Sequence, residues 1–174
     1  MKTECRLIRL LLLVCVFLQV AFFALAWGDL LPHGLFMQLS APGMSFEAMH
    51  ALSAGQRVGG ALLGLPVLAT LCYGMWRLAS ALHNVERRAV FDLDTIGHLR
   101  VFAGATLAAT ILGIVEVPLR ALLFRLAFAQ GGNKMSIGIS ADQVMLILLC
   151  ALFYLIIRIM HEGRRLAEEN EGFI

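Results

Sequence analysis

The sequence predicts an all-α protein, a four-helix bundle integral to a membrane, with short loops and a cytoplasmic C-terminal helix extension. Two observations lead to this fold class. The chain has 174 residues, of which 60% are hydrophobic and 15% are charged, whereas an ordinary soluble domain has roughly 45–50% apolar and about 25% charged residues. The apolar residues also gather in long blocks, as membrane spans require. At this length we expect a single transmembrane domain, 1–174.

Four apolar blocks are long enough to cross a bilayer, which takes about 20 residues of helix. The first three cover residues 7–27, 58–76 and 101–119. The fourth block is strictly apolar only over 144–157, and we extend it upstream to 137–157. These spans predict an outer interfacial segment at 28–56, an inner loop at 77–100 and a cytoplasmic tail at 158–174.

The distribution of basic residues predicts that both termini are cytoplasmic. Lys and Arg are retained on the cytoplasmic side of a membrane. One side of the four-span arrangement carries ten of them, and the other side carries only Arg57, Arg120, Arg125 and Lys134. The ten are Lys2, Arg6, Arg9, Arg77, Arg87, Arg88, Arg100, Arg158, Arg164 and Arg165.

The N-terminal block also resembles a secretion signal, with Ala24-Leu25-Ala26 as a cleavage site. Its apolar stretch is longer than the ~7–15 residues that are usual for the core of such a signal. We therefore favour its retention as a true first span.

The connections carry weaker patterns. In the outer segment, Phe46, Met49 and Leu52 share one face of a short helix that we expect to lie along the membrane–water interface. In the tail, Arg and Glu residues at i, i+4 spacing favour continuation of the fourth helix into the cytoplasm; these pairs are Arg158 with Glu162, Arg164 with Glu168 and Arg165 with Glu169.

Small residues recur at helical spacing in two spans, with Gly60 and Gly64 in the second and Gly104 and Gly113 in the third. Such surfaces let helices approach closely in lipid. We favour packing of the second and third spans against each other. A contact between two copies, giving a homo-oligomer, is the other explanation.

Glu116 is the one carboxylate well inside a strictly apolar span, and ionisable residues inside a membrane are candidates for function. Arg120 follows one helical turn later, and Pro118 lies between them. We favour a Glu116–Arg120 ion pair near the outer interface. A role for Glu116 in binding a proton or a cation is the alternative.

Patterns typical of catalysis and of cofactor or metal binding are missing. The sequence has no GxSxG, HExxH or phosphate-binding glycine loop, so we expect no enzyme, no catalytic residue and no cofactor. The four cysteines lie far apart and no histidine falls in mid-span, which disfavours zinc and haem. A net charge of +2 disfavours direct nucleic-acid binding.

Two stretches resemble an uncharacterised bacterial membrane family known as domain of unknown function 2975. The first is Phe91-Asp-Leu-Asp-Thr-Ile-Gly-His-Leu-Arg100, which resembles that family's segment opening the third span; Thr95 stands where the family usually has Asn. The second is Glu162-Gly-Arg-Arg-Leu-Ala-Glu-Glu-Asn170, which resembles the family's closing pattern. The resemblance implies no catalytic activity and a location in the bacterial inner (cytoplasmic) membrane.

Members of that family are often encoded beside a small helix-turn-helix regulator, so the resemblance implies a membrane partner that holds such a regulator. Our leading hypothesis is a non-enzymatic protein of the lipid bilayer with a cytoplasmic docking surface. The candidate docking residues are Phe91, Asp92, Asp94, Arg100, Glu168, Glu169, Asn170 and Glu171.

The runner-up hypothesis is a small transporter or ion-handling subunit. It would use Glu116 and an outer segment rich in Met and His, whose soft side chains suit a copper-like ion. The residues gathered there are His33, Met37, Met44, Glu47, Met49 and His50.

Overall fold

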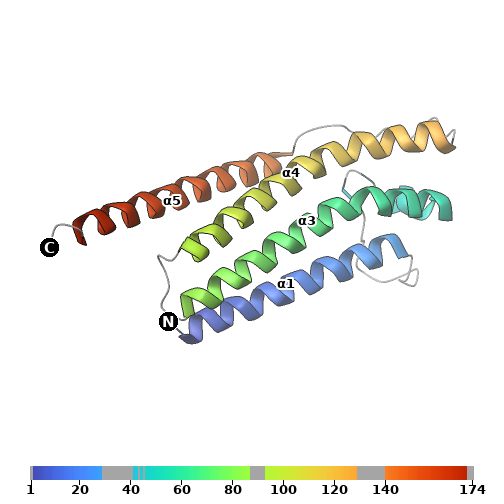
Figure 1. Cartoon of the computed structure of the whole chain (residues 1–174). Coiled ribbons are helices and arrows are strands. Elements are labelled where there is room, and N and C mark those ends of the chain that lie inside the picture. The colour runs from blue at the N-terminus through green and yellow to red at the C-terminus, as the bar shows by residue number, and fades with distance from the viewer. Residues whose placement is uncertain are drawn as a thin grey trace.

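A computed structural model of the chain describes residues 2–28, 41–42, 44, 46–86, 93–128 and 140–171. It contains five helices and, within those ranges, no strand, so the all-α prediction is confirmed (Figure 1). The helices are α1 (Lys2–Gly28), α2 (Phe46–His50), α3 (Ala54–Glu86), α4 (Leu93–Phe128) and α5 (Ala141–Glu171).

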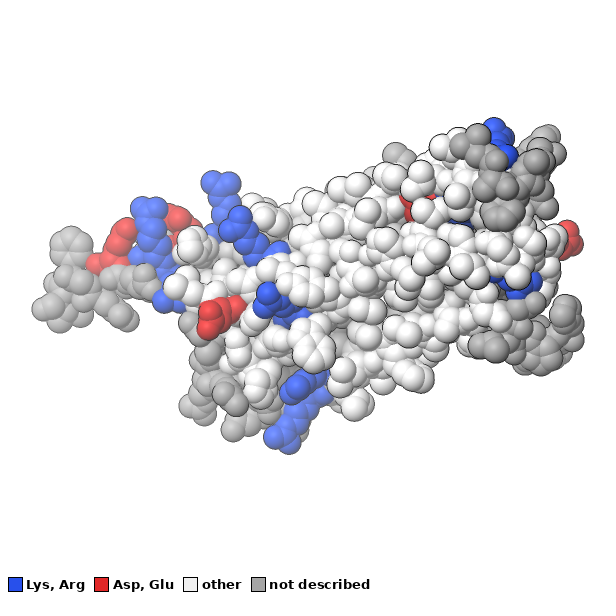
Figure 2. Space-filling view, turned by 45° about the vertical axis from the view of Figure 1, so that its right-hand side comes forward, with Lys and Arg blue, Asp and Glu red and all other residues white. Residues whose placement is uncertain are grey.

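Four of these helices are long and apolar enough to cross a membrane. The qualifying stretches are Arg6–Gly28, Ala54–Val85, Leu93–Arg125 and Ala141–Leu166. Most of their large apolar side chains, such as those of Phe17 and Leu62, point outward. This is the arrangement expected of helices that are surrounded by lipid. Figure 2 shows the same pattern on one face, where the middle of the molecule is free of charged residues and Lys and Arg lie toward the ends.

The long helices are arranged in chain order. Within the described helices, α1 packs along α3, α3 along α4 and α4 along α5. Neighbouring long helices run antiparallel, so α1 and α4 begin where α3 and α5 end (Figure 1). We call that end the termini side and the opposite end the far side.

Helix α5 is displaced along the bundle axis toward the termini side, and its last turns reach beyond the ends of the other long helices (Figure 1). Its contact with α4 is a small cluster in which Ile96, Ala103 and Ile157 are buried, with Leu99 and Met160 packed against them. After Met160 the side chains of α5 are mostly exposed. The last turns of α5 therefore extend past the packed part of the molecule.

The largest buried cluster lies on the far side. It joins Trp27 at the end of α1 to Phe124 of α4 and to Met44, Met49 and Leu52 from the segment that precedes α3. We expected Met49 and Leu52 to lie along the lipid interface, but both are buried, since α2 and the residues that follow it fold onto the end of the bundle. The described side chains do not include Phe46, the third residue of that predicted face.

Helices α3 and α5 begin with the same local motif, Ser-Ala-x-Gln. The backbone N–H of Ser53 donates to Gln56 Oε1 at 2.8 Å, and the N–H of Gln56 donates to Ser53 Oγ at 3.4 Å. Ser140 and Gln143 repeat the exchange at 2.9 and 3.3 Å. This is a capping box, which satisfies free N–H groups at a helix start. Because of it α5 begins at Ala141, later than the residue 137 that we predicted.

The glycine predictions need correction. An added Cβ at Gly60 would lie 2.1 Å from the Trp27 ring, and one at Gly64 would lie 2.8 Å from the Phe23 ring. Both glycines therefore leave room first of all for aromatic side chains of α1. Added Cβ atoms at Gly104 and Gly113 would meet nothing within 4 Å. The close approach of α3 to α4 lies instead at two other glycines, Gly59 beside Leu123 and Gly74 beside Ala105.

Candidate functional site

The far side contains a buried ion pair. Arg120 Nη1 donates to Glu116 Oε1 at 2.9 Å, and the two residues lie one turn apart on α4. Arg120 is fully buried and Glu116 is 9% exposed. The structure therefore places the two side chains together, in the interior rather than at an exposed interface.

Arg120 also joins α4 to two other segments. Its Nη2 donates to the carbonyl oxygen of Pro42, and its guanidinium carbon lies 5.7 Å from the centre of the Trp27 ring, within the range of a cation–π interaction. Its Nε is buried and has no hydrogen-bond partner within the described parts of the chain. One charged side chain thus contacts the end of α1 and the segment before α2.

A pocket of about 130 Å³ lies beside this pair, between α1 and α3. Its walls are mostly apolar and include aromatic residues of α1 and aliphatic residues of α3. Two polar side chains, Gln19 from α1 and Glu116 from α4, also line it. Gly64 lies at the pocket wall, where an added Cβ would be 3.6 Å from Glu116 Oε1.

The Met and His residues of the outer segment do not gather into a metal site in the described structure. Met44 and Met49 are buried in the far-side cluster, and Met49 Sδ accepts the backbone N–H of Ala41 at 3.4 Å. His33 and Met37 lie outside the described residues. Within the part of the chain that is described, no three His, Cys, Asp or Glu side chains are placed to hold a metal ion.

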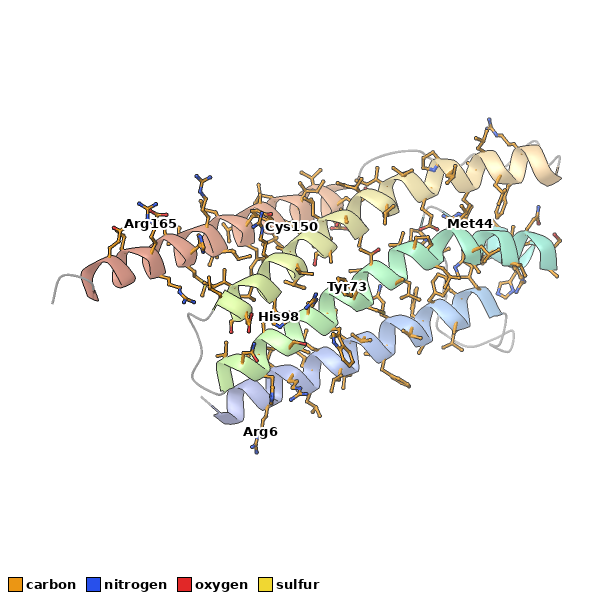
Figure 3. The ribbon with its side chains drawn as sticks, in the orientation of Figure 1. Arg6, Met44, Tyr73, His98, Cys150 and Arg165 are labelled. Carbon is orange, nitrogen blue, oxygen red and sulfur yellow. The ribbon has the colours of Figure 1, made fainter. Side chains whose placement is uncertain are left out.

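Two Arg–Tyr contacts lie toward the termini side, one within α3 and one between α4 and α5. Arg77 Nε donates to Tyr73 Oη at 3.0 Å, and its Nη1 lies 3.1 Å from Nδ1 of His98 on α4. Arg100 Nε donates to Tyr154 Oη of α5 at 3.2 Å. Figure 3 shows Tyr73 and His98 on the adjacent helices α3 and α4. Tyrosines and arginines at this level fit the edge of a membrane, where both are favoured.

Of the predicted docking residues, the structure describes the side chains of Asp94, Arg100 and Glu169. Phe91 and Asp92 lie outside the described residues, and Asp94 is exposed in the first turn of α4. Arg100 is exposed but bonded to Tyr154. The remaining four, Glu168, Glu169, Asn170 and Glu171, lie on the last turns of α5.

The last turns of α5 carry their own ion pairs. Arg165 Nε lies 3.0 Å from Glu169 Oε1, as the i, i+4 spacing predicted, and Arg165 Nη1 lies 3.4 Å from Glu162 Oε1. Glu162 therefore pairs with Arg165, where we had assigned it to Arg158; the Glu168 side chain lies outside the described set. Figure 3 shows Arg165 directed away from the other long helices.

Several of these features left signals in the sequence that we did not use. The repeated Ser-Ala-x-Gln is a known signature of a helix start, and Tyr73 with Arg77 has i, i+4 spacing. Gln19 is a polar residue in the middle of an apolar block. The contacts of Arg120 with Pro42 and Trp27 left no such signal, because they join residues far apart in the chain.

The model of one protein family, described as "Protein of unknown function (DUF2975)", matches residues 43–174, about three quarters of the chain. The match covers α2 to α5 and both stretches quoted for the resemblance, and α1 precedes it. No curated protein and no solved structure is detectably similar to the chain.

Proposed function

Because the chain belongs to the DUF2975 family, whose function is unknown, we propose a function from its own geometry: it is a non-enzymatic, multi-pass membrane protein that docks a small cytoplasmic regulator. The membrane is the bacterial inner membrane, and both termini lie in the cytoplasm. The regulator is of the helix-turn-helix type, as the family resemblance implies. The observation that carries the proposal is the projection of α5 past the rest of the bundle.

The projecting part of α5, residues 161–171, follows the cluster that α5 shares with α4, and most of its described side chains are exposed. It extends about 16 Å beyond Met160 at 1.5 Å per residue. An isolated helix of this length is marginal in water, so a partner helix or groove would stabilise it. Leu166, which is 52% exposed, is the apolar residue that such a partner would bury.

The charges near this segment suit a basic partner. Asp94 and Glu169 are both exposed on the termini side, and acidic groups favour encounter with the basic surface of a DNA-binding domain. Asp94 begins α4, whereas Glu169 lies about 13 Å further along α5 than Met160. The partner would therefore follow the side of α5 and would not sit on a compact acidic patch.

The test is a binding assay with purified proteins. The full chain in detergent would be mixed with the helix-turn-helix protein encoded beside its gene, and co-purification would be measured. We expect binding to be lost when residues 168–174 are deleted and to weaken at least severalfold for Leu166→Ala. Ile159→Ala, which removes a similarly exposed side chain of α5 before the projecting segment begins, is the matched control.

Two results would refute regulator docking. One is that the full chain fails to retain the regulator. The other is that the chain without residues 168–174 retains the regulator as well as the full chain does. A weakening by Ile159→Ala that matches Leu166→Ala would also contradict the proposal, since it would indicate a general effect on α5.

A further inference from the structure

The pocket between α1 and α3 has the properties of a ligand site. Its volume of about 130 Å³ is close to that of an apolar cavity known to hold benzene. The walls are apolar apart from Gln19 and Glu116. An apolar pocket with a few converging polar groups is the usual form of a small-molecule site.

The pocket opens toward the surface that lipid covers. Gln19 is exposed on α1, and Phe22 beside it is 47% exposed. Gln19 lies about 13 Å from the end of α1 at Gly28, which is well inside the membrane span. A molecule dissolved in the bilayer could therefore enter from the side without crossing water.

The polar groups define the kind of ligand. One oxygen of Glu116 already accepts from Arg120, so the pair as a whole is neutral and a charged ligand would leave an uncompensated charge in lipid. A carboxylate only accepts hydrogen bonds, so the ligand must bring a donor. The Gln19 amide both donates and accepts hydrogen bonds, and a hydroxyl group can pair with it in either role.

The apolar walls define the rest of the ligand. Phe22, Phe23 and Trp27 line the pocket, and aromatic side chains favour an aromatic partner through edge and offset ring contacts. We propose that this pocket binds one small, neutral, hydroxyl-bearing amphiphile from the bilayer, a phenol or similar ring alcohol, with its ring against Phe22, Phe23 and Trp27 and its hydroxyl directed to Gln19 and Glu116. The proposal is independent of regulator docking.

The pocket contains a tryptophan whose fluorescence can report on ligand binding. The chain has two tryptophans; Trp27 lines the pocket, and Trp76 is 71% exposed on another part of the surface. The full chain carrying Trp76→Phe would be reconstituted in phosphatidylcholine vesicles, and its fluorescence would be followed with para-bromophenol, because bromine quenches on contact. Bromobenzene, which lacks the hydroxyl, is the matched probe.

We expect saturable quenching by para-bromophenol at a membrane concentration about tenfold lower than bromobenzene requires, as the loss of a hydrogen bond to a charged group implies. Val67→Phe, which fills a wall of the pocket, should abolish the saturable part. Val58→Phe makes the same change on the same helix at a residue that is 60% exposed, and it should have no effect. Gln19→Leu should reduce the preference for the hydroxylated probe.

Three outcomes would overturn the proposal. The first is quenching that rises without saturation, which would mean simple partition into lipid. The second is an equal response of Val67→Phe and Val58→Phe. The third is saturation by both probes at the same concentration, which would show that the pocket takes any apolar molecule, an acyl chain included.

Discussion

Among single residues, Arg120 has the most varied contacts. It is fully buried and joins Glu116, the carbonyl of Pro42 and the ring of Trp27. Removing one partner of a buried pair leaves the other charge uncompensated and costs about 3–5 kcal/mol. We therefore expect Arg120→Met to lower the free energy of unfolding by that amount in an SDS-unfolding titration. Arg125→Met, one turn later at an exposed position, should change it little.

Variants of Glu116 distinguish a structural role of the ion pair from a role in ion transport. Replacing both partners, Glu116→Leu with Arg120→Leu, should recover most of the stability lost in Arg120→Met, because a buried pair can often be replaced by apolar residues without loss. Glu116→Gln alone should fold and should leave any ion flux through reconstituted vesicles unchanged. A flux that requires the Glu116 carboxylate would favour the transporter hypothesis instead.

Sequence reasoning at the residue scale succeeded for contacts within one helix. The spacing of Glu116 and Arg120 predicted their pairing, and that of Arg165 and Glu169 predicted theirs, because i, i+4 neighbours meet on any α-helix. It could not predict that Arg120 would be buried. That depends on Pro42 and the segment 46–52 lying over the end of the bundle, which no local pattern encodes.

At the scale of the elements, the contact of α1 with α3 depends on glycine. Gly60→Ala would place a Cβ 2.1 Å from the Trp27 ring, and overpacking of this kind costs about 1–3 kcal/mol. Gly104→Ala meets nothing within 4 Å and should be neutral or slightly stabilising, since Ala favours helix over Gly. Thermal unfolding in one detergent would compare the two variants. Equal effects would contradict the assigned helix contact.

The capping boxes give a second prediction at this scale. Ser140→Ala removes the side-chain acceptor for the Gln143 N–H and should cost about 0.5–2 kcal/mol. Ser53→Ala should behave alike at the start of α3. Hydrogen exchange of the first turn of each helix would show local fraying. Protection that is unchanged in both variants would mean that the caps do not hold these helix starts.

The elements were predictable in number and type, but their partners were not. Hydropathy identified four spans because bilayer thickness sets the length of an apolar helix. It could not distinguish a glycine stripe that faces Trp27 of α1 from one that faces α4, since both have the same spacing. The start of α5 was missed for a different reason, because the apolar block was extended upstream to the length of a membrane span and the Ser-Ala-x-Gln signature was not used.

For the whole molecule, the open chain-order arrangement gives the two outer helices different roles. Helix α1 is tied into the far side through Trp27, which is 8% exposed and contacts both α3 and Arg120. Among the described helices α5 packs along α4, and it projects at the other end. The pocket and the projecting segment are thus separated along the bundle. The pocket lies beside α1, and the projecting segment is the end of α5.

This arrangement bears on whether α1 is kept. The signal-like sequence Ala24-Leu25-Ala26 lies inside α1, and cleavage after Ala26 would remove the whole membrane-crossing part of the helix and one wall of the pocket. We expect the intact mass of the membrane-extracted protein to include α1. With α1 retained, four spans place both termini on one side, and from the ten-to-four charge distribution we expect that side to be cytoplasmic. Green fluorescent protein fused after residue 174 should then fluoresce, whereas alkaline phosphatase inserted between α4 and α5 should be active. A mature protein that begins at Trp27 would leave three spans with its new N-terminus outside, and would contradict both the retained helix and the pocket.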